Sequence, residues 1–310
     1  RHTRFRNVTG VQTCALPIYV VNYAASKIED RPTTRIETKV VNGQMLISAL
    51  DGVPTTSPEL TNRYFVDGGA TLRELGEPDT LYINDGHGKF TAVSWTDGSF
   101  LDESGKALTL PPYDWGLSAM FRDMNGDGAP DLYVCNDLFT PDRIWINDGK
   151  GHFRAIAPLA IRQTSLFSMG VDFADINRDG FDDFLVVDML SRSLADQKIQ
   201  TVGVLPPKLR IGKFDDRPAY KRNTLFLNRG DGTYAEIGQL SGVDATGWSW
   251  SPVFLDVDLD GYEDLLVSAG YYRDALNADT VERMKNAKGA RKLSEAEFRE
   301  LKKLYSPLPQ

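Results

Sequence analysis

A short acidic loop occurs three times in this sequence, each time between two apolar runs. The loop follows the pattern D-x-[DN]-x-D-G-x-x-D and covers residues 123–131, 175–183 and 256–264, which we call loops one, two and three. Recurrence of one motif indicates a repeat architecture, in which every copy is a supersecondary unit that packs against its neighbours. The flanking runs are short, apolar and rich in aromatic and branched residues, so they predict strands on both sides of each loop.

A second motif alternates with the acidic loop. It consists of an apolar run, a turn with two glycines and an aromatic residue, and it covers residues 81–90, 144–153 and 225–234. This pattern is typical of a β-hairpin, and we call it the glycine hairpin. Asn147 precedes Asp175 by 28 residues, and Asn228 precedes Asp256 by the same 28 residues, so the two motifs keep a fixed spacing.

Two hairpins supply four strands, which is the composition of one blade of a β-propeller. The fold class predicted for the chain is therefore all-β, a propeller of four-stranded blades. Residues 132–134, 184–187 and 265–267 are continuous apolar runs. Strands covered on both faces have this composition, so we expect these three to be inner strands packed between neighbouring blades.

The composition of the acidic loops indicates calcium. Oxygen side chains at positions 1, 3, 5 and 9 converge only if the loop curls tightly, which the glycine at position 6 allows, and position 7 then offers its backbone carbonyl. Carboxylate and amide oxygens without histidine or cysteine suit a hard cation, and about three structural calcium ions are expected. The predicted ligands are Asp123, Asn125, Asp127, Ala129, Asp131, Asp175, Asn177, Asp179, Phe181, Asp183, Asp256, Asp258, Asp260, Tyr262 and Asp264.

Two other interpretations of the loops compete with a calcium site. Turns rich in Asp, Asn and Gly are common between strands without any ion, but three copies between matching strands favour a metal site. An EF-hand requires helical flanks and a bidentate Glu at position 12, where this chain has Val134, Val186 and Val267. The EF-hand interpretation therefore fails.

The complete unit resembles the FG-GAP or VCBS repeat of the N-terminal propeller of integrin α chains. Residues 168–175 and 248–252 further resemble bacterial proteins related to the ASPIC/UnbV group and to cartilage acidic protein. The resemblance covers roughly residues 78–272 and implies the same ligands in each loop. It also implies a secreted, periplasmic or cell-surface location and a non-catalytic module that binds or adheres to a protein or a glycan through its rim loops. The alternative is the propeller portion of a secreted hydrolase or lyase that acts on polysaccharide.

The segments outside the repeats differ from one another in composition. Residues 1–18 resemble translated sequencing-adapter read-through, so we expect no ordered structure there. Residues 19–77 contain no acidic loop. We expect this N-terminal segment to form part of a blade. Residues 191–222 are an insertion in the repeat period, expected at the rim, and residues 273–310 are expected to be helical, with a capping box at Ser294.

The number of repeats falls short of a ring. Three loops are present, no glycine hairpin follows the third, and a propeller needs about four to eight blades to close. We therefore expect an incomplete propeller, truncated at both ends.

Several function classes are disfavoured. A net charge of −8 argues against a nucleic-acid partner, and no apolar stretch is long enough to span a membrane. No constellation of nucleophile, base or catalytic metal is evident, so an enzyme is not expected. The histidines of the repeats, His87 and His152, lie in equivalent turns, and the tryptophans are assigned to strand cores in preference to a sugar site. These tryptophans are Trp115, Trp145, Trp248 and Trp250.

Overall fold

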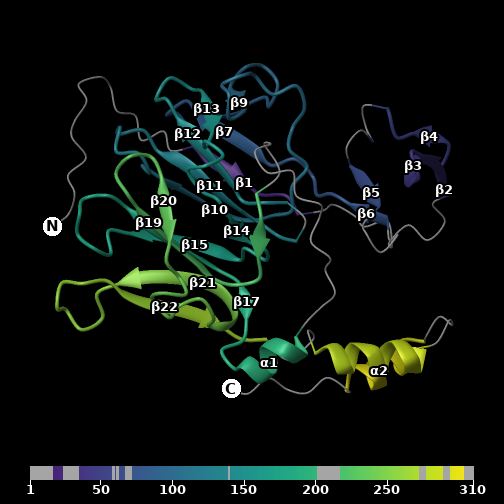
Figure 1. The fold of residues 1–310 in the computed structure, drawn as a ribbon. Helices are drawn as coiled ribbons and strands as arrows, with labels where there is room; N and C mark the ends of the chain where they lie inside the picture. The colour runs from purple at the N-terminus through teal and green to yellow at the C-terminus, as the bar shows by residue number, and fades with distance from the viewer. Residues whose placement is uncertain are drawn as a thin grey trace.

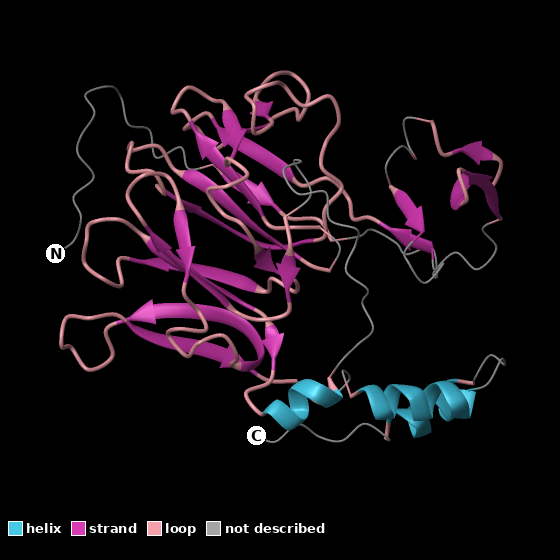
Figure 2. Ribbon diagram, viewed as in Figure 1, coloured by secondary structure: helices cyan, strands magenta, loops and turns pink. Residues whose placement is uncertain are grey.

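The chain is almost entirely β-structure. The computed structural model describes residues 17–23, 35–57, 60, 63–66, 72–138, 140–200, 217–271, 277–288 and 294–303. Figure 2 shows that strands dominate the described residues and that helices are few. The prediction of an all-β fold is confirmed.

Four sheets follow one another along the chain, and we call them sheets A to D (Figure 1). Sheet A contains β1 (Ile18–Val20), β7 (Thr80–Asn84) and β8 (Phe90–Ala92). Sheet B contains β10 (Gly116–Arg122), β11 (Asp131–Asn136), β12 (Arg143–Asn147) and β13 (Phe153–Ala155), with β9 (Phe100–Leu101) parallel to β13. Sheet C contains β15 (Gly170–Ala174), β16 (Asp183–Val187), β19 (Thr224–Asn228) and β20 (Tyr234–Glu236). Sheet D contains β21 (Gly247–Leu255), β22 (Asp264–Ala269) and β17 (Met189–Leu190).

Sheets B and C each consist of two consecutive hairpins, as predicted. In sheet B the antiparallel order is β10, β11, β12 and β13, and in sheet C it is β15, β16, β19 and β20. The first strands of successive sheets contact one another, β10 with β15 and β15 with β21. This is the arrangement of consecutive blades in a propeller-like fold.

Alternate residues of the inner strands enter different cores, because successive side chains of a strand point to opposite faces. In β11, Leu132 and Val134 belong to the core shared with sheet A, whereas Tyr133 belongs to the core shared with sheet C. In β16, Phe184 faces sheet B and Leu185 faces sheet D. Both faces of β11 and β16 are therefore covered, as their continuous apolar sequence predicts.

Strand β22 departs from that prediction. Leu265 and Val267 pack into the core shared with sheet C, but Leu266, which points to the other face, is 58% exposed. Its counterparts Tyr133 and Leu185 are 1% and 0% exposed. The expectation that residues 265–267 are covered on both faces is therefore wrong for this strand within the described residues, since no further sheet lies against its outer face there.

Insertions occupy the same place in two repeats, between the second and third strands of the unit. In sheet A, two small sheets formed by five strands separate β1 from β7. These strands are β2 (Ile36–Val41), β3 (Gln44–Leu50), β4 (Val53–Pro54), β5 (Tyr64–Val66) and β6 (Leu72–Glu74). In sheet C, the predicted insertion at 191–222 contains α1 (Leu194–Ile199) and β18 (Ala219–Tyr220), which pairs with β14 (Thr164–Ser165). Residues 201–216 of this insertion lie outside the described residues.

The first described strand corrects one predicted boundary. Ile18 was assigned to the artefactual segment, yet it begins β1, which pairs with β7 as β11 pairs with β12. Residues 1–16 lie outside the described residues.

The C-terminal segment contains the expected helical structure, α2 (Ala278–Lys288) and α3 (Glu295–Lys302). Helix α3 begins with the predicted capping box, since the Ser294 N–H and hydroxyl donate to Glu297 Oε2 and the Glu297 N–H donates back to Ser294 Oγ.

Candidate metal centre

All three acidic loops connect the first and second strands of a sheet. Loop one joins β10 to β11, loop two joins β15 to β16, and loop three joins β21 to β22. Each loop is closed by the pairing of the residue before position 1 with the residue at position 9: Arg122 with Asp131, Ala174 with Asp183 and Leu255 with Asp264. The strand, loop, strand arrangement predicted from the sequence is confirmed.

The backbone of the loops curls through two left-handed residues. The glycine at position 6 has φ of 89° in Gly128, 92° in Gly180 and 89° in Gly261, as the pattern predicts. Position 4 also has positive φ, and there loops two and three place Arg178 and Leu259, at 62° and 63°. A side chain in this conformation is strained, so the contacts of the loop must hold the curl. The pattern gave no sign of this second left-handed position.

The carboxylate at position 1 organises each loop. Its Oδ2 accepts the N–H of the position 6 glycine at 2.9 Å in Asp123, Asp175 and Asp256. The other oxygen differs between loops. Asp123 Oδ1 and Asp175 Oδ1 accept the N–H of position 5, at 3.1 and 2.9 Å. Asp256 Oδ1 is buried and has no hydrogen-bond partner within the part of the chain that the structure describes.

The carboxylate at position 5 orients the residue at position 7. Oδ1 accepts the N–H of Ala129 at 2.8 Å in loop one, of Phe181 at 2.9 Å in loop two and of Tyr262 at 2.8 Å in loop three. Position 7 was predicted to contribute its carbonyl to an ion, and these bonds fix the peptide on its amino side.

Position 3 separates loop three from the other two. Asn125 and Asn177 donate their side-chain amides to the position 5 carboxylates Asp127 and Asp179, at 3.0 and 2.8 Å. Loop three has Asp258 at this position, which has no such donor. In loops one and two this amide therefore offsets part of the carboxylate charge, whereas in loop three position 3 adds a further carboxylate.

In loop three the carboxylates converge. Asp256, Asp258 and Asp260 each offer an oxygen, and these oxygens all lie within 4.8 Å of one another. Two oxygens bound to one calcium ion at about 2.4 Å can be no more than about 4.8 Å apart, so the spacing suits a shared ion. Asp256, whose Oδ1 has no hydrogen-bond partner among the described residues, is a member of this cluster. The donor set, hard oxygens only, fits calcium.

The carboxylate at position 9 also links its loop to the next strand, a role that the ligand pattern did not reveal. Asp131 Oδ2 accepts the N–H of Met124 at 2.8 Å and its Oδ1 accepts the N–H of Asn147 at 2.7 Å, so it ties the loop to the next strand, β12. Asp183 bonds Ile176 and Asn228 of β19 in the same way, at 3.1 and 2.7 Å. Burial raises the pKa of both Asp131 and Asp183 to about 6. Asp264 is exposed and accepts only the N–H of Val257, at 3.0 Å, among the bonds seen in the described residues.

Sequence reasoning missed a set of buried acids distant in sequence from the loops. Asp142 accepts bonds from the Tyr133 hydroxyl, the Ser168 hydroxyl and the Asn136 N–H, and burial raises its pKa to about 7. Asp79 accepts bonds from the Tyr19 hydroxyl and the Asn22 N–H in sheet A, and burial raises its pKa to about 7 as well. Both residues directly precede the first strand of a glycine hairpin, and in sheet C that position is Asn223. This recurring position was the signal that could have revealed them.

The histidine and tryptophan expectations have clear outcomes. His152 is an exposed turn residue bonded to Asp148 at 2.8 Å. Trp115 and Trp145 are 9% and 0% exposed, as core residues should be, but Trp250 is 44% exposed. Assigning all four tryptophans to strand cores was therefore wrong for Trp250.

Comparison with known proteins identifies the repeats. A family model described as FG-GAP-like repeat matches residues 123–186 and 216–267, which contain loops one, two and three and the hairpin strands of sheet C. The chain therefore contains FG-GAP-like repeats, and its all-β architecture is the propeller-like one that such repeats form.

A curated relative extends the similarity. The chain is 28% identical over 216 residues to a T-cell immunomodulatory protein homolog of Plasmodium yoelii yoelii. The match covers 61% of this chain and 30% of the relative, so the chain spans less than a third of the relative's length. Similarity to ASPIC/UnbV proteins remains a prediction.

Proposed function

We propose that this chain is a calcium-binding propeller module that acts outside the cell by binding a protein or a glycan, without catalysis. The observation that carries the proposal is the carboxylate cluster of loop three. Asp258 and Asp260 are exposed, so at the dielectric constant of water two charges 4.8 Å apart repel by about 1 kcal/mol, and the cluster contains three such pairs. A divalent ion would turn this repulsion into attraction, and its binding free energy would add to the stability of the folded state.

The location of the protein is proposed from the repeats. FG-GAP repeats are typical of extracellular proteins. None of the helices in the described part of the chain has both the length and the apolar character that crossing a bilayer requires. Extracellular calcium reaches millimolar concentrations, at which loop sites of modest affinity are filled.

An aromatic surface on sheet D supports the binding role. Trp248 stacks on Tyr271 with ring centroids 4.2 Å apart, and Trp250 and Tyr271 are 44% and 45% exposed. Exposed aromatic side chains present large contact area with little conformational freedom to lose, and they contribute strongly to interfaces. A Trp250→Ala variant is expected to weaken binding on a glycan array or to a captured protein partner while the melting temperature stays within a few degrees.

Thermal unfolding in millimolar calcium and in EDTA tests the calcium assignment. We expect calcium to raise the melting temperature, and we expect Asp260→Asn to reduce that rise, since it removes a clustered carboxylate. The matched control is Asp85→Asn, which alters an exposed turn carboxylate of a glycine hairpin. Equal melting temperatures with calcium and with EDTA would contradict the proposal.

A further inference from the structure

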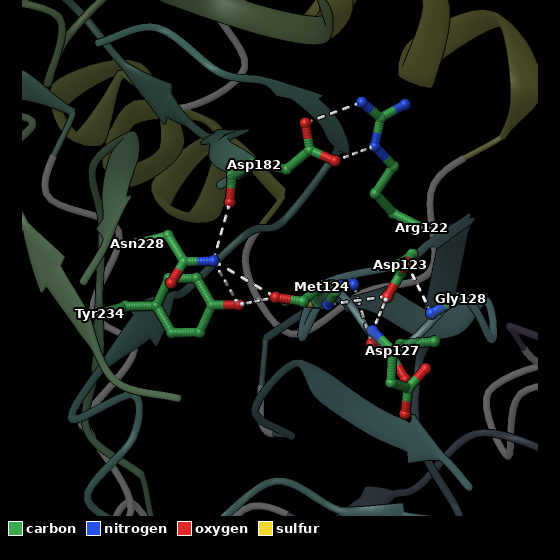
Figure 3. Close-up of polar contacts among 10 residues, drawn as sticks. Arg122, Asp123, Met124, Asp127, Gly128, Asp182, Asn228 and Tyr234 are labelled. Atoms are coloured by element: carbon green, nitrogen blue, oxygen red, sulfur yellow. Dashed lines mark hydrogen bonds and ion pairs between the residues drawn. The ribbon is translucent and has the colours of Figure 1, made fainter. Parts of the chain in front are cut away.

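Loops one and two belong to different sheets, yet their position 9 carboxylates are connected through only two residues. Asp131 Oδ2 of loop one accepts the N–H of Met124. The carbonyl of Met124 accepts the side-chain amide of Asn228 at 3.2 Å, and the N–H of Asn228 donates to Asp183 Oδ1 of loop two at 2.7 Å. Figure 3 shows the part of this path where Asn228 and Tyr234 of sheet C converge on the Met124 carbonyl.

The path is enclosed and held by further contacts. Met124, Asn228 and Tyr234 are 3%, 4% and 7% exposed, so water does not compete for these bonds. The Tyr234 hydroxyl donates to the same Met124 carbonyl at 3.2 Å, and the Asn228 amide also donates to the carbonyl of Asp182 at 3.2 Å. A bidentate ion pair lies outside the core. It joins Arg122, which precedes loop one, to Asp182 of loop two.

The equivalent asparagine of sheet B, Asn147, does not connect two loops among the described contacts. The N–H of Asn147 donates to Asp131, as the N–H of Asn228 donates to Asp183. Its side-chain amide, however, donates to Pro130 of its own loop at 3.0 Å. Asn147 is thus a natural control, with the same backbone role and no bond to a second loop among the described contacts.

We propose that the ion sites of loops one and two are coupled, so that an ion in either loop raises the affinity of the other, and that Asn228 transmits the coupling. This inference rests on the proposed calcium binding. An ion in loop two fixes Asp183 and with it the backbone of Asn228, whose amide then holds Met124 and the curl of loop one. The second ion consequently orders less of the chain than the first, which is the physical basis of positive cooperativity without a change of fold.

The test is a cycle of calcium titrations on the full chain by isothermal calorimetry, with loop three silenced throughout by Asp258→Asn and Asp260→Asn. The affinity of loop two is measured with loop one intact and with loop one silenced by Asp127→Asn. Silencing loop one is expected to weaken loop two by about fivefold or more, the lower end of ordinary coupling strengths. In an Asn228→Ala background, silencing loop one should change the calcium affinity of loop two by less than about twofold. In an Asn147→Ala background, silencing loop one should weaken loop two by the same fivefold or more as in the parent protein.

A milder variant keeps the test decisive if Asn228→Ala fails to fold. Tyr234→Phe removes only the hydroxyl that reaches Met124, and the equivalent hairpin residue in sheet B is Phe153. In the Tyr234→Phe variant, silencing loop one should weaken loop two by less than in the parent protein and by more than in Asn228→Ala. Calcium binding to loop two with the same affinity whether loop one is intact or silenced would overturn the coupling alone. Absence of calcium binding in every variant would overturn the proposed function as well.

Discussion

Replacement of Asp131 by alanine should destabilise the protein even when no calcium is present. The carboxylate, 0% exposed, accepts the N–H groups of Met124 and Asn147, and both would lose their partner. A buried donor without a partner costs about 1–3 kcal/mol, so the two together cost about 2–6 kcal/mol. Burial raises the pKa of Asp131 to about 6, which means that the carboxylate is itself poorly solvated. Its removal therefore recovers part of the loss, and about 3 kcal/mol is the expected net change.

The assay is urea unfolding in EDTA, followed by circular dichroism, with the slope of the transition checked against the parent protein. Asp264→Ala is the matched control, because Asp264 occupies the same position in loop three, is exposed and accepts only the Val257 N–H at 3.0 Å within the described contacts. It should lose about 1 kcal/mol or less. Similar losses for the two variants in EDTA would refute the assignment of Asp131 as a bond between loop and strand, and would leave it only a ligand role.

Two further predictions concern acidic groups with contrasting environments. The pKa of Asp142 is raised by burial to about 7 in the folded protein, so the folded state holds a proton that the unfolded state has released, and stability should fall as pH rises from about 4 to about 7. Asp142→Asn places in sheet B the residue type that Asn223 supplies in sheet C. In EDTA, the difference between the unfolding midpoints at pH 5 and at pH 8 should be smaller for this variant than for the parent protein. An unchanged difference would contradict the raised pKa of Asp142 as a cause of the pH dependence. In loop three, Asp258→Asn should stabilise the calcium-free protein by about 1 kcal/mol or less, because Asp258 and Asp260 are exposed and the new amide can donate to Asp260 as Asn125 donates to Asp127. The same variant should weaken calcium binding in calorimetry. Greater calcium affinity in this variant would contradict the role given to Asp258.

The sequence predicted the loops well because their chemistry is local. A glycine at position 6 has few alternatives when the chain must adopt positive φ, and the apolar runs on both sides predict strands without reference to distant residues. The left-handed conformations of Arg178 and Leu259 escaped prediction because neither residue type favours them. In both loops the carboxylates at positions 1 and 5 accept N–H groups of the loop backbone, and these bonds depend on how the whole loop folds.

Contacts between repeats could not be predicted from one motif at a time. The path from Met124 to Asn228 joins residues more than 100 positions apart, and its geometry depends on how sheets B and C pack. Strand β1 was missed for a different reason. Residues 18–22 match residues 132–136 in pattern, but no acidic loop precedes them to draw attention to the repeat. The exposed face of β22 likewise follows from the absence of a covering sheet within the described residues, which the apolar run itself does not report.

The most direct test of the account is a count of bound ions. Equilibrium dialysis against millimolar calcium, followed by atomic emission, should give about three ions per chain, one for each loop. Asp127→Asn, Asp179→Asn and Asp260→Asn should each lower the count by about one, and Asp85→Asn should leave it unchanged. A count at the level of the dialysis buffer, or one that none of the three loop variants lowers, would contradict the claim that these loops hold calcium.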